Sequence, residues 1–225
     1  MTVLPSDADL PDRDAVLGQA IPFDRARWIP LLPDSTWWPG ALDECPKAGR
    51  WPWVDRRTVL GIAARADTAE GRRHLLVAAL VWGTGTKAQS VIRRARIFEH
   101  TTAEEIDARL DAALGVLQEM GAVEAYRAFN NDQRIPHLGA AFFTKVLCFA
   151  GGDSVKGPYR PIILDRVVSR ALKDHGAVAP NWPDNGWTTD QYRQYLAAVH
   201  AYAHSRGVFP DQIEAALFSK GKLLP

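Results

Sequence analysis

The stretch that decides the fold is His137–Leu172, "HLGAAFFTKVLCFAGGDSVKGPYRPIILDRVVSRAL". Its apolar spacing predicts a helix over 139–150, a loop of about eleven residues and a second helix that begins after Asp165. Lys145 lies inside the apolar run "AAFFTKVLCFA", and Asp165 closes the run "PIIL". Each of the two segments is therefore built for burial, and each places one charge in or beside its apolar run.

Two interpretations of Lys145 are open. In a helix its neighbours one turn away are Ala141 and Phe142 before it and Cys148 and Phe149 after it, all of them apolar. The lysine stem could pack on this face while its ammonium group reaches water. Alternatively, burial lowers the pKa of a lysine, and a neutral amine can attack carbon as a nucleophile.

Asp165 is also open to two interpretations. It precedes a helix with the apolar stripe Val168, Ala171 and Leu172, where it can cap the first amides, and capping alone explains it. A capping carboxylate stays ionised, and at the edge of a cleft it can stabilise a cationic transition state. The short loop lets the two helices lie side by side. An amine and a fixed carboxylate on adjacent helices suit displacement at the anomeric carbon of a sugar.

These segments resemble the catalytic lysine and aspartate segments of helix-hairpin-helix DNA glycosylases, and the nearer likeness is to the branch of bacterial proteins similar to 8-oxoguanine DNA glycosylase. The pattern of that branch is close to Leu-Gly-x-Ala-Phe-x-Thr-Lys followed by Leu-Asp-x-x-Val. The matching residues are Leu138, Gly139, Ala141, Phe142, Thr144, Lys145, Leu164, Asp165 and Val168. Trp187, Tyr192, Tyr195 and "IEAALF" near the C-terminus also resemble the branch, so the likeness extends over residues 80 to 225.

The resemblance implies a mainly all-α fold of two helical subdomains with a cleft between them. It implies that Lys145 attacks the deoxyribose anomeric carbon and forms an imine after the base leaves, so that β-elimination can nick the strand. Asp165 would position the lysine and stabilise the developing positive charge. The partner is double-stranded DNA that contains a modified base, and no cofactor is implied. An oxidised purine such as 8-oxoguanine is the family's usual substrate, in DNA repair. The alternative is a hypermodified base, such as glucosylated hydroxymethylcytosine of phage DNA, in phage defence.

The hairpin before the lysine departs from the superfamily's common pattern. That pattern reads Leu-Pro-Gly-Val-Gly, with the lysine two residues past the last glycine. Here the text at 135–139 is "IPHLG", with His137 in place of the first glycine and Lys145 six residues past Gly139. A hairpin whose amides approach a phosphate prefers glycine. His137 and Gly139 are DNA-binding candidates, in a hairpin that is either rebuilt or weaker in its phosphate contact.

A glycosylase must flip its target nucleotide and hold the base between apolar faces. Candidates for that pocket are Trp37, Trp38, Trp51, Trp53, Phe149, Trp187 and Phe218, although tryptophans in a domain of this size are also common core residues. For phosphate contact, "VIRRARIFEH" supplies Arg93, Arg94 and Arg96, and a predicted loop supplies Gly83, Gly85 and Lys87. The alternative for the arginines is a solvated helix face.

Composition leaves these expectations open. The chain has 225 residues, 47% of them hydrophobic, and a formal net charge of +1, which argues against a generic nucleic-acid coat but allows a local basic patch. Two cysteines without a Cys-x-x-Cys pair and six histidines without ligand spacing predict no metal site. The N-terminus is unlike a signal peptide, and no apolar run has the length of a membrane span. We expect a soluble cytoplasmic monomer.

The chain divides by composition near residue 57. Residues 1–57 are rich in proline and tryptophan and are expected to pack on the core as irregular pieces with a short strand or two. Residues 58–225 are expected to form a helical domain, with the helix-hairpin-helix and catalytic segment at 135–172. The run 101–130 carries the clearest helical signal and opens with a capping box, and another capped helix is expected to end at Gly207. Two rival functions remain, a non-catalytic helical DNA-binding module and an all-α interaction protein.

Overall fold

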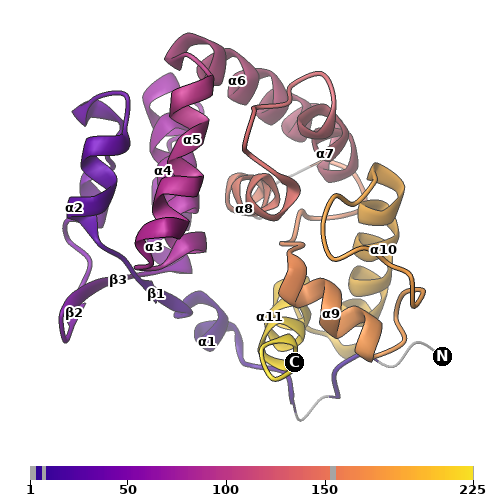
Figure 1. Ribbon diagram of the computed structural model, residues 1–225. Coiled ribbons are helices and arrows are strands. Elements are labelled where there is room, and N and C mark those ends of the chain that lie inside the picture. Colours follow the sequence, from indigo (N-terminus) through magenta and orange to yellow (C-terminus); the bar gives the residue numbers. More distant parts are fainter. Residues whose placement is uncertain (1–3, 7–8, 153–155, 225) are drawn as a thin grey trace.

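The computed structural model describes residues 4–6, 9–152 and 156–224, which form a mainly helical fold with one small sheet (Figure 1). The helices are α1 Arg13–Leu17, α2 Arg25–Trp28, α3 Arg56–Ala63, α4 Ala69–Thr84, α5 Ala88–His100, α6 Ala103–Met120, α7 Ala122–Asn130, α8 Ala140–Gly151, α9 Arg166–Asp174, α10 Thr189–Arg206 and α11 Pro210–Gly221. The predicted mainly α class is confirmed. The two helices predicted around the deciding stretch are α8 and α9.

The helix ends follow local capping chemistry. Asp165 caps α9 by accepting bonds from the amides of Val167 and Val168. Thr102 opens α6 with a capping box, and Thr188 opens α10 with another. Gly207 ends α10 in the left-handed conformation that glycine adopts without strain. These starts and stops were predictable because each depends on residues within one turn of the helix end.

The run 101–130 forms two helices rather than one. The chain breaks between α6 and α7 at Gly121, which has a φ of 88°. A Cβ atom at this position would lie 2.4 Å from the carbonyl oxygen of Lys156. The break therefore comes from a close approach of a distant backbone segment, which leaves no periodic signal in the sequence.

The first part of the chain forms short pieces held together by strand pairing. In the described residues, β1 (Ala20–Pro22) and β2 (Lys47–Ala48) both pair antiparallel with β3 (Trp51–Asp55). Short 3-10 turns lie between β1 and β2, at Ile29–Leu31, Ser35–Trp37 and Gly40–Leu42. Proline density explains the irregular backbone here, because proline removes an amide donor and interrupts helices.

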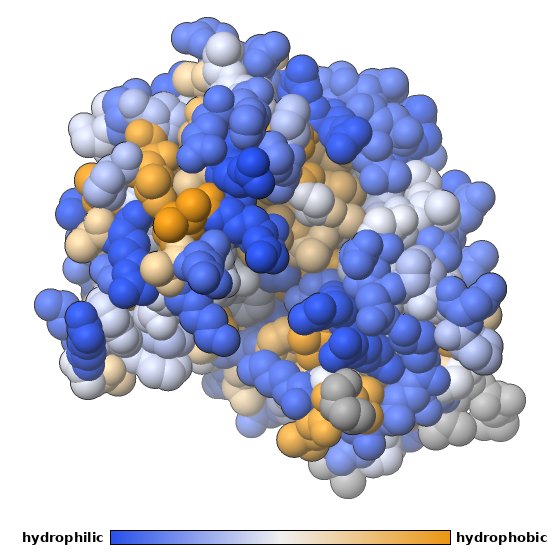
Figure 2. Space-filling view, viewed as in Figure 1, coloured by the Kyte–Doolittle hydropathy of each residue, from blue (hydrophilic) through white to orange (hydrophobic). Residues whose placement is uncertain are grey.

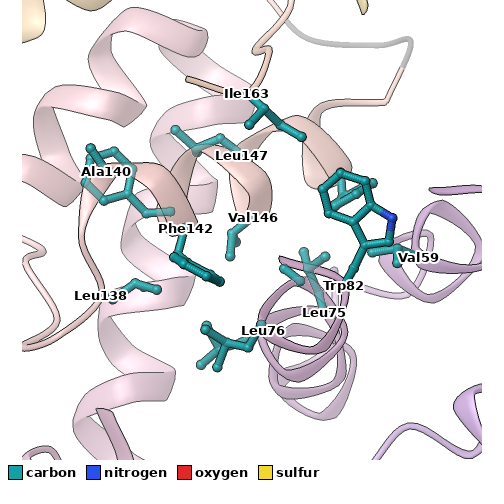
Figure 3. Close-up of a cluster of buried hydrophobic side chains, with 14 of the residues drawn as sticks. Val59, Leu75, Leu76, Trp82, Leu138, Ala140, Phe142, Val146, Leu147 and Ile163 are labelled. Carbon is teal, nitrogen blue, oxygen red and sulfur yellow. The ribbon is translucent and has the colours of Figure 1, made fainter. Parts of the chain in front are cut away.

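Helix α8 lies at the centre of the fold and packs against α4, α3, α6 and α7. Figure 3 shows Phe142 and Val146 of α8 near Leu75 and Leu76 of α4, with Trp82 beside them. Nearly all these side chains are at least nine-tenths buried. The helix that carries Lys145 is therefore fixed on several sides by apolar contacts, which hold its position.

Two groups of elements lie on either side of α8. Helices α2 to α5 and the sheet form one group, and α9, α10 and α11 form the other (Figure 1). Figure 2 shows a hollow between these groups, with hydrophilic side chains along its edges. The N-terminal segment crosses from one group to the other, since Tyr202 of α10 donates to the Pro5 carbonyl and Trp82 of α4 donates to the Gln19 carbonyl.

Candidate active site

The structure places the two predicted charges in direct contact. The Nζ atom of Lys145 lies 3.2 Å from Oδ2 of Asp165, and it also donates to the Ala141 carbonyl at 2.8 Å. Lys145 is 4% exposed, and the Asp165 side chain is 15% exposed. The lysine therefore does not extend into open solvent, and its ammonium group is held against the carboxylate at the start of α9.

Asp165 performs two tasks with its two oxygens. Oδ1 accepts from the amides of Val167 and Val168 at 3.0 and 3.1 Å, while Oδ2 faces Lys145. The cap predicted from sequence and the ion pair are thus compatible properties of one side chain.

Aromatic rings and a glycine surround the rest of the lysine. Its Nζ lies 5.2 Å from the ring centre of Phe142 and 6.0 Å from that of Trp82. Gly83 lies inside α4 rather than in a loop, and a Cβ atom there would lie 2.7 Å from Phe142 and 2.9 Å from Cδ of Lys145. Gly83 was predicted as a loop glycine, and its contact with the lysine could not be predicted, since nothing local indicates what a helical glycine faces.

In the hairpin before α8, His137 adopts a backbone conformation that glycine usually occupies. His137 has a φ of 66°, in the left-handed region, and is the one non-glycine residue with positive φ in the described ranges. Its ring lies against that of His100 at a centroid distance of 4.6 Å. Partial desolvation, together with the charges of His100 and Arg96, lowers the pKa of His137 below its usual range. His137 therefore takes a left-handed conformation that glycine adopts without strain.

A groove of about 510 Å³ lies at the N-terminus of α8. Its lining includes Gly139, Ala140, Arg94 and Arg134. Gly139 is the N-cap and provides no side-chain bond, so the first amides of α8 point outward with the positive end of the helix dipole. Arg134 was not predicted from sequence because it stands alone, without a neighbouring basic residue. Two guanidinium groups at an uncapped helix start suit an anion such as phosphate.

The basic residues predicted at the start of α5 and along it differ in whether their side chains face solvent or the protein interior. Lys87, Arg93 and Arg96 are exposed at the start and along the outer face of the helix. Arg94 instead turns inward and stacks on Phe142, with its Cζ atom 4.1 Å from the ring centre. Burial, and then the neighbouring charge of Arg93, lowers the pKa of Arg94. Arg94 therefore lies between the exposed basic face and the ring next to Lys145.

The aromatic candidates are scattered. Trp37 is fully buried against Phe98, Trp38 is buried and donates to Asp43, and Trp51 and Trp53 are half-buried in β3. Trp187 is buried in the loop before α10, and Phe218 is half-buried on α11. The structure does not gather these side chains around Lys145. Of the predicted set, Phe149 lies one turn after Lys145 on α8, and it packs edge-on against Trp82 at 5.5 Å.

Phe149 also lines a cavity of about 410 Å³ whose lining includes Arg13, Arg56 and Asp211. Arg56 is 2% exposed and pairs at 2.7 Å with Glu214, which is 1% exposed. Burial raises the pKa of Glu214, and Arg56 partly offsets that effect. One oxygen of Asp211 is buried and has no hydrogen-bond partner among the described residues. Nothing in the sequence predicted the Arg56–Glu214 pair, whose partners are separated by 158 residues.

The described residues hold neither a metal-binding cluster nor a helix that could span a membrane. No cluster of three or more His, Cys, Asp or Glu side chains is arranged to hold a metal ion in the part of the chain that the structure describes. Within the same part, none of the helices has the length and apolar character that a membrane span requires.

Comparison with known proteins gives one match. The model of the family described as "OGG: Putative 8-oxoguanine DNA glycosylase OGG-like protein" matches residues 14–218. No curated protein and no solved structure matches the chain. The family match covers most of the chain and includes Lys145, Asp165 and the hairpin between α7 and α8.

Proposed function

Because this chain belongs to the OGG-like family, we propose that it is a bifunctional DNA glycosylase with Lys145 as nucleophile and Asp165 as its electrostatic partner. The observation that carries the proposal is the nearly buried contact of 3.2 Å between Nζ of Lys145 and Oδ2 of Asp165. A lysine held beside a fixed carboxylate supplies the two groups that the reaction needs.

The reaction follows from these two groups. Lys145 first gives up its ammonium proton to water, and the free amine then attacks C1′ of the deoxyribose. The bond between C1′ and the base breaks with its electron pair leaving on the base, which takes up a proton from water. Asp165 offsets the positive charge that develops on the sugar ring. Ring opening then gives an imine between Lys145 and C1′, and loss of a C2′ proton expels the 3′ phosphate by β-elimination. The α9 amides hold Oδ1 of Asp165, which leaves Oδ2 facing Lys145.

Support for DNA as the partner comes from the groups around the hairpin. Lys87, Arg93 and Arg96 are exposed on α5, and the groove at the start of α8 brings Arg94 and Arg134 to uncapped amides. Such an arrangement attracts phosphates through charge and through amide donors. The flipped nucleotide would then reach Lys145 beside Phe142, on which Arg94 stacks.

We assign the excised base to the cavity lined by Phe149. Trp82 connects the two places, because its ring lies 6.0 Å from Nζ of Lys145 and packs against Phe149. The cavity offers an apolar ring and the guanidinium of Arg56, and Asp211 brings a buried oxygen that lacks a donor. A nucleobase has both a planar face and polar edges. Replacing Phe149 with Leu should slow base excision while leaving imine formation on abasic DNA unchanged.

The substrate is tested with a panel of duplexes. One set carries 8-oxoguanine and other oxidised purines, and a second carries hydroxymethylcytosine with and without glucose, beside genomic DNA of phages that contain it. Excision of an oxidised purine assigns the protein to repair, and excision of the glucosylated base assigns it to phage defence. No excision on any duplex would contradict the proposed function.

Two variants control the panel. Lys145→Gln should reduce excision by about 10³-fold or more, because removing a nucleophile leaves only the contributions of binding and electrostatics. Asp165→Asn keeps the capping oxygen and removes the charge, and it should cost about 100-fold. If Lys145→Gln binds DNA and excises as wild type does, the lysine is not the nucleophile. DNA binding with no excision by wild type would instead indicate the non-catalytic module.

A further inference from the structure

The backbone just before Asp165 is held by a series of side-chain hydrogen bonds. Residues 160–164 form an extended segment, "RPIIL", that connects the loop after α8 to the start of α9. Its last three residues are almost fully buried. Tyr192 donates to the Ile162 carbonyl at 3.0 Å, and Tyr195 donates to the Ile163 carbonyl at 2.8 Å. Both tyrosines come from α10.

Thr144 holds the next residue of this segment. Its hydroxyl accepts from the Leu164 amide at 3.2 Å, and it lies 3.3 Å from the Leu164 carbonyl and 2.7 Å from the Ala140 carbonyl. Thr144 precedes Lys145 in α8, and Leu164 precedes Asp165. One hydroxyl therefore connects the residue before the lysine to the residue before the carboxylate.

We propose that Thr144 and Tyr195 are positioning residues that set the distance between Lys145 and Asp165, a role that rests on the proposed glycosylase function. Asp165 is fixed on its far side by the α9 amides, but those bonds only join it to its own helix. Its placement relative to α8 needs contacts that cross from one element to another. The Thr144 hydroxyl supplies such a contact from α8, and Tyr195 supplies one from α10.

The hydrogen bonds of Thr144 and Tyr195 are expected to persist, because both hydroxyl groups are buried. Thr144 and Tyr195 are both at least 99% buried, so water does not compete for their bonds. Burial raises the pKa of Tyr195 well above its usual value, so its phenol remains a donor across the range of pH in which the enzyme would work. Catalytic groups must be held closely in place, because a displacement of about 1 Å can cost ~100-fold in rate.

The test measures imine formation with a duplex that already contains an abasic site, so that base recognition is not involved. The rate at saturating protein and the DNA concentration for half-saturation are measured separately by borohydride trapping, well below the melting temperature of each variant. Thr144→Val keeps the shape of the side chain and removes the hydroxyl, and it should lower the rate about tenfold or more with little change in half-saturation. Thr144→Ser restores the hydroxyl and should recover most of the wild-type rate.

The tyrosines have a matched control. Tyr126 is also fully buried and donates its hydroxyl to a backbone carbonyl, that of Trp187, at 2.7 Å, but this carbonyl is outside the segment 160–164. Tyr195→Phe should slow imine formation severalfold, whereas Tyr126→Phe should leave it at the wild-type rate. Equal losses in the two variants would indicate general destabilisation and overturn the proposal.

The outcomes separate this inference from the function on which it rests. If wild type forms no adduct with abasic DNA, the proposed function fails. If wild type forms the adduct and Thr144→Val forms it at the same rate, the function stands and the positioning role is wrong. A loss in Thr144→Val that Thr144→Ser does not recover also overturns the role of the hydroxyl.

Discussion

A lysine that is 4% exposed needs close partners for its charge, because an isolated ammonium group away from water is unfavourable by several kcal/mol. Lys145 has two such partners in the Ala141 carbonyl and Asp165. The helix-cap interpretation of Asp165 is confirmed, and the same carboxylate serves as the charge partner. At Lys145 the alternative in which the ammonium reaches open water is wrong. Whether the amine is a nucleophile stays a proposal.

Gly83 lies against the side chain of Lys145, so a substitution at Gly83 tests whether the position of the lysine matters for its reaction. A methyl group there would lie within 3 Å of Phe142 and of the Lys145 stem, so the lysine must move if alanine replaces glycine. We expect Gly83→Ala to reduce imine formation on abasic DNA by more than about tenfold, since the ammonium would leave its place beside Asp165. The change should be measured together with the free energy of unfolding in urea.

Gly115 provides the matched control on α6. It is also a helical glycine, but a Cβ atom at Gly115 meets no atom within 4 Å. Gly115→Ala should stabilise the fold by about 0.5–1 kcal/mol and leave imine formation unchanged. Wild-type activity in Gly83→Ala would contradict the geometry that we describe around Lys145.

Among the elements, the hairpin before α8 shows what a single departure from a family pattern does. His137 occupies the left-handed region, where residues other than glycine pay about 1 kcal/mol or more. His137 therefore keeps, at this position, a backbone conformation that glycine could also adopt. What changes is chemistry, because an imidazole now stands where a glycine would leave bare amides.

If His137 faces a phosphate of bound DNA, we expect the DNA affinity to depend on pH. The pKa of His137 lies below its usual range in the free protein, because of partial desolvation and of the charges of His100 and Arg96. A bound phosphate would raise that pKa, so binding is favoured by protonation and the affinity should increase severalfold as pH falls from about 8 to about 5.5. Fluorescence anisotropy of a duplex with a tetrahydrofuran abasic analogue, at constant salt, measures this.

His137→Gly is the variant for that experiment, since glycine adopts a φ of 66° without strain and does not titrate. It should keep the stability of the fold and show a flatter dependence of affinity on pH. An equal pH dependence in wild type and His137→Gly would mean that His137 does not face a phosphate.

The elements differ in how far their sequences predict them. The starts of α6, α9 and α10 and the end of α10 were predictable, because Thr102, Asp165, Thr188 and Gly207 act within one turn of the chain. The break at Gly121 was not, because its cause is the distant Lys156 carbonyl. The candidate pair of Lys145 and Asp165 was partly predictable. The helix of each residue follows from its local sequence, but the contact of 3.2 Å between them depends on how α8 and α9 pack.

Over the whole molecule, the feature hardest to predict is the buried pair of Arg56 and Glu214. These residues come from α3 and α11, and Gln19 of the N-terminal segment also bonds Arg56. No periodicity or motif relates positions so far apart. The tryptophans illustrate the same limit, because Trp37, a candidate for the base pocket, is fully buried in the core.

The Arg56–Glu214 pair should contribute strongly to stability only while both partners are present. Breaking a buried pair leaves one charge without a partner, so Arg56→Met and Glu214→Leu should each destabilise the fold by about 3–5 kcal/mol. The double variant Arg56→Met with Glu214→Leu should be destabilised by much less than the sum of the single changes. Urea unfolding measures all four proteins, and strictly additive losses would contradict the pairing.

The most direct test of the central claim is the position of the covalent bond. Wild-type protein is mixed with a duplex that carries an abasic site, the imine is reduced with borohydride, and the adduct is digested and located by peptide mass spectrometry. We expect a single modified residue, Lys145, and no adduct in Lys145→Gln. Attachment at another lysine or at the N-terminal amine, or an unchanged adduct in Lys145→Gln, would contradict it.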